Sequence, residues 1–142
     1  DAEIYCVLTG PPRPPITVLW RASGIRKVSP DERSIALWLK KILAEPAGKE
    51  WKDVKPGMFI AARSFQEVIA ELRGRPTYVL HEKGEPLTRE KIGEEPVFVL
   101  GDSEGMPKNE ESFVLRNGEK FSLGKNSYLA SACISVVNWL VD

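Results

Sequence analysis

Two apolar segments in the last third of the chain each run directly into a glycine-containing loop. Residues 96–100 open into the loop 101–105, and residues 121–123 open into the loop 124–127. Unbroken apolar runs with β-branched and aromatic residues are typical of strands buried on both faces, as in a parallel sheet covered by helices. Ligands of such sheets bind where the strands end. The two loops therefore predict a shared pocket for a small molecule with many hydrogen-bonding edges.

The rest of the chain alternates between strand and helix signals, which predicts an α/β fold. Ser29 before Pro30 and Glu32 forms a capping box, so a helix is expected from there to about residues 46–48, with an apolar face of Ile35, Leu39, Ile42 and Leu43. Further helices are predicted over 64–72 and 132–140. Strands are predicted over 4–9, 16–20 and 77–80, with a proline-rich loop over 10–15, a turn-rich link over 53–57 and a strand end at 81–84.

Charge is balanced overall but not along the chain. Across 142 residues, 20 Lys and Arg face 20 Asp and Glu, yet residues 1–75 hold 13 basic and 9 acidic side chains. The basic excess is sharpest over residues 10–41. A local basic surface can recruit nucleic acid even when the net charge is zero, although scattered solvated side chains would give the same count.

Cysteine usage and missing motifs exclude several classes of protein. Cys6 and Cys133 are far apart, so neither a disulfide framework nor a metal site is implied, and a reduced cytoplasm is expected. No membrane-spanning run and no signal peptide is visible, so no membrane association is expected. The sequence contains no dinucleotide fingerprint, P-loop or nucleophile elbow, which argues against the common nucleotide folds and against a serine hydrolase.

Four segments together resemble a known family, the archaeal tRNA pseudouridine-54 N1-methyltransferases of the SPOUT class. They are residues 28–36, with their Ser-Pro-Asp-Glu-Arg run, residues 78–81, residues 98–105, and Ser122-Leu123 followed by Cys133-Ile134. The resemblance implies a single domain over 1–142, a mostly parallel sheet flanked by helices, and a C-terminal trefoil knot. It also implies an S-adenosylmethionine-dependent enzyme that works as a homodimer on tRNA.

The resemblance also implies a set of site residues. Backbone groups of three strand-end segments would hold the cofactor, with two leucines beside the adenine; these residues are Leu80, Gly101, Leu123, Gly124, Lys125, Asn126, Ser127, Tyr128 and Cys133. Asp31 would act as general base and Arg33 would stabilise charge on the uracil ring. An alternative for Asp31 is to complement the helix dipole. Arg21, Arg26 and Lys27 would bind tRNA phosphates.

The chain departs from the family in two places. Members generally carry a strand and a helix before the segment that starts here at Asp1, and they usually have histidines near the last helix, where this chain reads Leu129-Ala130-Ser131-Ala132. Two other interpretations therefore remain open. One is a methyltransferase that acts on pseudouridine N1 in ribosomal RNA, and the other is a non-catalytic protein that binds S-adenosylmethionine or RNA.

Overall fold

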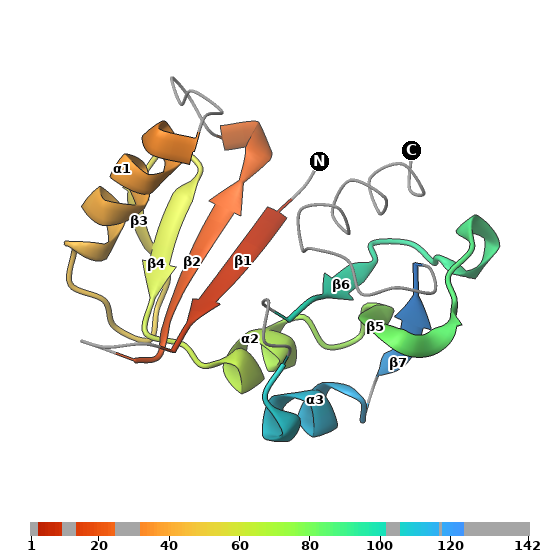
Figure 1. Ribbon diagram of the computed structural model, residues 1–142. Coiled ribbons are helices and arrows are strands. Elements are labelled where there is room, and N and C mark those ends of the chain that lie inside the picture. The colour runs from red at the N-terminus through yellow and green to blue at the C-terminus, as the bar shows by residue number, and fades with distance from the viewer. Residues whose placement is uncertain (1–2, 10–13, 25–31, 102–105, 117, 124–142) are drawn as a thin grey trace. The chain divides into compact units, whose positions relative to one another are not determined.

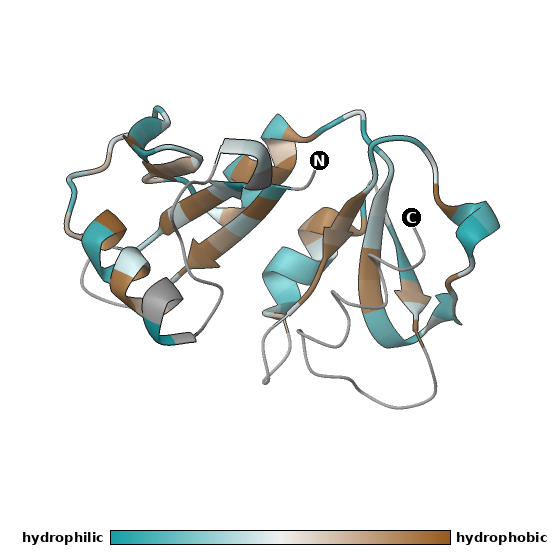
Figure 2. Ribbon diagram, turned by 90° about the horizontal axis from the view of Figure 1, so that it is seen from above, coloured by the Kyte–Doolittle hydropathy of each residue, from teal (hydrophilic) through white to brown (hydrophobic). Residues whose placement is uncertain are grey.

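The structure is a computed structural model that describes residues 3–9, 14–24, 32–101, 106–116 and 118–123 (Figure 1). The chain divides into two compact units, Asp1–Val68 and Ile69–Asp142. Hydrophobic residues are concentrated in the strands of both units, as the brown segments of Figure 2 show. Within the described ranges, no helix is long and apolar enough to cross a membrane.

The first unit contains a four-stranded antiparallel sheet in the order β1-β2-β4-β3. Its strands are β1 (Glu3–Leu8), β2 (Ile16–Arg21), β3 (Lys52–Lys55) and β4 (Met58–Ala61), with a short 3-10 helix η1 (Ala22–Gly24) after β2 and the helix α1 (Glu32–Leu43) before β3. The strands predicted over 4–9 and 16–20 are confirmed. The antiparallel pairing and the strand β4 were not predicted.

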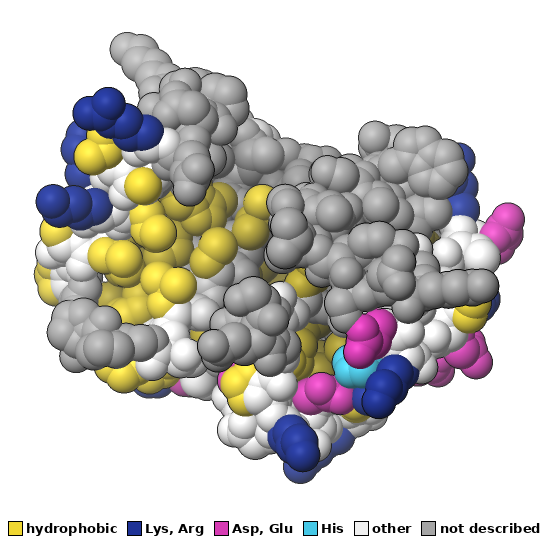
Figure 3. All heavy atoms as spheres, in the orientation of Figure 1, with side chains coloured by type: hydrophobic (Ala, Val, Ile, Leu, Met, Phe, Trp, Pro, Cys, Tyr) yellow, Lys and Arg dark blue, Asp and Glu magenta, His cyan; other side chains and the backbone are white. Residues whose placement is uncertain are grey.

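The core of the first unit lies between α1 and one face of this sheet. Val18, Ile60 and Met58 alternate with residues of the other face and pack with Ile42, the buried residue of α1. The predicted apolar face of α1 is confirmed at Ile42, and Leu39 and Leu43 pack around it. Figure 3 shows further hydrophobic side chains gathered on the visible face of this unit.

The predicted turn-rich link over 53–57 is wrong in its first half. Residues 53–55 belong to β3, and only Pro56 and Gly57 form the turn that leads into β4. Gly57 has a φ of 78°, which a hairpin turn requires and glycine adopts without strain. The strand was missed because β3 is an edge strand of mostly exposed, charged residues, so it lacks the apolar alternation that predicts strands.

The helix α2 (Phe65–Glu71) confirms the helix predicted over 64–72. The backbone N–H of Glu67 donates to Ser64 Oγ over 3.2 Å, and the Ser64 N–H donates to Glu67 Oε1 over 3.1 Å. These reciprocal bonds form a capping box. Two backbone donors at the start of the helix therefore have partners.

The second unit contains a three-stranded parallel sheet in the order β6-β5-β7. Its elements are β5 (Thr77–Pro86), a short 3-10 helix η2 (Arg89–Lys91), β6 (Val97–Val99), α3 (Lys108–Val114) and β7 (Gly118–Ser122). This sheet confirms the parallel arrangement predicted from the two apolar segments. The short helix α3 was not predicted, and β7 begins earlier than expected.

The sequence predicted that the central strand β5 ends at residues 81–84. In the structure β5 continues to Pro86. Leu80 and Glu85 both lie opposite Phe121 of β7, so the residues between them leave the ladder and the strand then returns to it. The local signals at 81–84, two charged residues and a glycine, therefore mark an irregularity within the strand rather than its end.

An aromatic cluster forms the core on one face of the parallel sheet. The ring of Tyr78 in β5 lies 5.4 Å from the ring of Phe98 in β6 and 5.3 Å from that of Phe121 in β7. The Tyr78 hydroxyl donates to the carbonyl oxygen of Lys91 and accepts from the N–H of Gly93. The segment around η2 is thereby joined to this face.

Two expectations fall on residues outside those described. They are the start of the first helix at Ser29 and the last helix over 132–140. The C-terminal knot and the single domain stay predictions.

Candidate functional site

Three predicted cofactor-binding segments converge at one edge of the parallel sheet. Val79 of β5 lies opposite Val99 of β6, and Leu80 lies opposite Phe121 of β7. Because the three strands are parallel and in this register, β6 and β7 end close to the point where the first stretch of β5 leaves the ladder, after Leu80. Leu80 therefore lies beside the ends of β6 and β7, which Gly101 and Leu123 follow in the chain, and a shared pocket at this edge stays a prediction.

The apolar part of this edge is built by two leucines. Leu80 ends the first stretch of β5 and Leu123 follows β7, and both pack against the cluster of Tyr78, Leu87 and Phe121. Each leucine is only partly buried. Part of the apolar surface of each leucine therefore packs into the cluster, and part of it remains outside.

The edge fits S-adenosylmethionine in the chemistry it offers. Partly exposed Leu80 and Leu123 suit the faces of an adenine ring, and Gly101 provides backbone N–H and C=O groups without a side chain to block them. Gly124, Lys125, Asn126, Ser127, Tyr128 and Cys133 lie outside the described residues.

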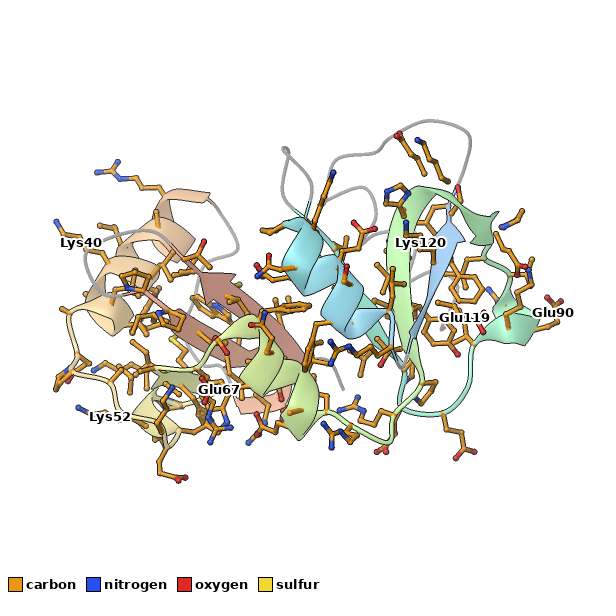
Figure 4. All side chains as sticks on the ribbon, turned by 90° about the horizontal axis from the view of Figure 1, so that it is seen from below. Lys40, Lys52, Glu67, Glu90, Glu119 and Lys120 are labelled. Carbon is orange, nitrogen blue, oxygen red and sulfur yellow. The ribbon has the colours of Figure 1, made fainter. Side chains whose placement is uncertain are left out.

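An ion pair lies close to this edge and was not predicted. Lys120 Nζ of β7, labelled in Figure 4, lies 2.9 Å from Glu111 Oε1 of α3, and both side chains are partly exposed. The hydrogen bond from Lys120 is the main cause that lowers the pKa of Glu111, and the charges of Lys120, His81 and Lys108 act in the same direction against desolvation. Glu111 is therefore held as a carboxylate.

His81 follows Leu80 at the same edge. Its Nδ1 accepts a hydrogen bond of 3.1 Å from the N–H of Lys83, within the segment that leaves the β5–β7 ladder. Figure 3 shows the histidine side chain, in cyan, among acidic side chains in magenta and basic ones in dark blue. The sequence showed His81 only as a residue at a strand end, and no local pattern connects it with Glu111.

The predicted substrate residues that are described lie in the first unit. Arg33 is an exposed residue of the first turn of α1. Arg21 ends β2, where its Nε donates to Glu3 Oε2 over 2.7 Å and its guanidinium lies 5.0 Å from the centre of the Phe59 ring. The hydrogen bond to Glu3 is the main cause that raises the pKa of Arg21. The other members of this set, Asp31, Arg26 and Lys27, lie outside the described residues.

Comparison with known proteins places this chain among RNA-modifying enzymes. A family model described as SAM-dependent RNA methyltransferase matches residues 1–142. Two curated relatives, from Methanococcus maripaludis strain C5 and Thermococcus gammatolerans, are 37% and 35% identical over the whole chain, which covers 74% and 73% of their lengths. Both are named tRNA (pseudouridine(54)-N(1))-methyltransferase.

A solved structure shows a similar fold. It is Archaeoglobus fulgidus Nep1 bound to S-adenosylhomocysteine, with a TM-score of 0.65 and 14% sequence identity. The match covers 88% of this chain and 56% of that one. At this identity the likeness shows a shared fold.

Proposed function

Because this chain belongs to the family of SAM-dependent RNA methyltransferases, we propose that it methylates N1 of pseudouridine 54 in tRNA. The names of its curated relatives support this substrate, and the matches cover the whole chain. The basic excess over residues 10–41 is consistent with an RNA substrate. We further propose that the protein acts as a homodimer in the cytoplasm.

The convergence of Leu80, Gly101 and Leu123 at one sheet edge is the observation that carries this proposal. The resemblance assigns these segments to the cofactor, and their packing is independent of that assignment. When bound, S-adenosylmethionine supplies a methyl group on a positively charged sulfur and leaves as S-adenosylhomocysteine. Leu80 and Leu123 would contact the adenine, and backbone groups of Gly101, Gly124–Tyr128 and Cys133 would orient the rest of the molecule.

The reaction joins the methyl carbon to N1 of pseudouridine as the sulfur–methyl bond breaks, and N1 loses its proton. Asp31 would accept this proton as general base. The guanidinium of Arg33 would stabilise the negative charge that develops on the uracil ring. Holding the base in line with the methyl group would supply much of the rate.

Arg21, Arg26 and Lys27 would bind phosphates of the tRNA, while the target base leaves its stack to reach the cofactor. The Nε of Arg21 already donates to Glu3, so phosphate contact would come from other N–H groups of its guanidinium. This pair also holds the guanidinium in a defined position at the end of β2.

A binding and methylation assay tests the proposed function. Calorimetry should show that the protein binds S-adenosylhomocysteine, and mass spectrometry should show one added methyl group on pseudouridine 54 of a tRNA that already carries this base. A ribosomal RNA fragment that contains pseudouridine serves as the competing substrate. Methylation of that fragment alone would support the ribosomal RNA alternative, binding without methylation would support a non-catalytic protein, and absence of binding would overturn the proposal.

Two variants test the residue roles against a matched control. Asp31→Asn should lower kcat by about 10²–10⁴-fold, as expected for loss of a general base. Arg33→Ala should lower kcat by about 10²-fold. Lys40→Ala removes another exposed cation from α1 (Figure 4) and should change kcat less than twofold. Equal activity of Asp31→Asn and the wild type would leave only the helix-dipole role for Asp31.

A further inference from the structure

One carboxylate on α3 interacts electrostatically with the two strands that border it at the cofactor edge. Glu111 forms its ion pair with Lys120 of β7, and the charge of His81 in β5 acts on it as well. Lys120 lies opposite Val79 in the β5–β7 register, one residue before Leu80. The ion pair is thus one residue away from Leu80 along the ladder, with Lys120 on the face of the sheet opposite to that of Leu80 and Phe121.

The helix that carries Glu111 follows the segment that leaves β6. Gly101 comes directly after this strand and its flanking leucine, and α3 begins at Lys108. β6 is already joined to β5 by the parallel ladder. The ion pair attaches α3 to β7. Both β6 and the helix that follows it in the chain are therefore attached to the sheet.

Partial burial makes this ion pair stronger than an ordinary surface pair. The side chains of Lys120 and Glu111 are 35% and 23% exposed, whereas those of the Lys52–Glu45 pair are 43% and 45% exposed. Charges shielded from solvent attract each other more strongly and are screened less by salt. The buried Val114, one turn further along α3, adds apolar packing to the same attachment.

We propose that the Glu111–Lys120 ion pair is a positioning device that sets the spacing of the three cofactor-binding segments. We assign Glu111 and Lys120 as positioning residues, because the contact that the structure shows is between their two side chains. The inference rests on the proposed function, since it requires that the cofactor binds at this edge. It predicts that the pair controls cofactor affinity more than the rate of methyl transfer.

Neutral variants of nearly the same shape test this role. Glu111→Gln and Lys120→Gln should each weaken binding of S-adenosylhomocysteine about fivefold in calorimetry, which corresponds to about 1 kcal/mol. The KM for S-adenosylmethionine should rise to a similar extent, while kcat at saturating cofactor stays within about twofold of the wild type. Glu45→Gln breaks the exposed pair with Lys52 and should leave both constants unchanged.

A charge exchange separates positioning from a loss of folding. The double variant Glu111→Lys with Lys120→Glu restores an ion pair in the opposite sense and should recover about half or more of the lost affinity. Wild-type affinity and KM in Glu111→Gln and Lys120→Gln, or a fall in kcat with unchanged KM, would overturn the inference. If the wild type binds no S-adenosylhomocysteine, both the proposed function and this inference fail. If the wild type binds it normally and only the variants depart from expectation, only the inference about the ion pair fails.

Discussion

The backbone of Gly84 lies directly against the backbone of Lys120. A Cβ at position 84 would come within 2.5 Å of the carbonyl carbon of Lys120, a distance at which carbon atoms repel strongly. This close approach occurs where β5 returns to β7 after the irregularity, just before Glu85 pairs with Phe121. Glycine at this position therefore allows the central strand to pair twice with the same neighbour.

Gly84→Ala should destabilise the protein, because the added methyl group forces one of the two backbones to move. We expect the free energy of unfolding in urea to fall by about 1–3 kcal/mol. Gly48→Ala is the matched control, since no atom lies within 4 Å of its added Cβ. That substitution should be neutral or raise the free energy by less than about 1 kcal/mol. Equal effects of the two substitutions would contradict the close approach.

Tyr78→Phe should reveal the value of the buried hydroxyl. The phenol group joins the Lys91 carbonyl and the Gly93 N–H over 2.9 and 2.7 Å, while the ring contacts with Phe98 and Phe121 survive the substitution. We expect a loss of about 1–2 kcal/mol in thermal or urea unfolding. Tyr78→Leu also removes the ring contacts and should cost more; a smaller cost for Leu than for Phe would contradict this assignment.

Ser64→Ala should destabilise the start of α2. The side chain accepts from the Glu67 N–H, and alanine leaves that donor without its capping oxygen. The expected loss is about 1 kcal/mol in the free energy of unfolding. Ser64→Thr keeps the hydroxyl and should retain most of the stability. Identical unfolding curves for the alanine variant and the wild type would show that the capping box contributes nothing in solution.

Glu111 should make stability depend on pH in the acid range. Because the hydrogen bond from Lys120 holds its pKa below the ordinary value, the folded state favours the carboxylate. This contribution is complete above the unfolded pKa of about 4.3 and is lost as the pH falls through the lower, folded pKa. The difference in unfolding free energy between wild type and Glu111→Gln should therefore be larger at pH 7 than at pH 3. The same difference at both values would contradict a lowered pKa.

The sheet edge that we propose for the cofactor could be predicted because its signal is local. The apolar runs around Phe98 and Phe121 carry no polar alternation, and each leads into a glycine, so both the buried strands and the loops at their ends follow from short stretches of sequence. The family resemblance then added Leu80 as a third segment. The register of the sheet places Leu80 beside the ends of β6 and β7, as these signals implied.

The missed features depend on contacts between residues far apart in the sequence. Glu111 and Lys120 form an ion pair because the fold brings α3 beside β7. The sequence of neither segment alone predicts this pair. Arg21 likewise pairs with Glu3 because the β1–β2 register places them opposite each other. Charged β3 became a strand through its pairing with β4, and its own residues favour an exposed loop.

The middle strand of the parallel sheet is the first of the three to be synthesised. A growing chain can pair Tyr78 with Phe98 as soon as β6 has left the ribosome, but Leu80 gains Phe121 only when the last strand is complete. Pairings between segments so distant in sequence form late, because a long loop must close first. The sheet edge proposed for the cofactor is therefore complete only after β7 has paired with β5.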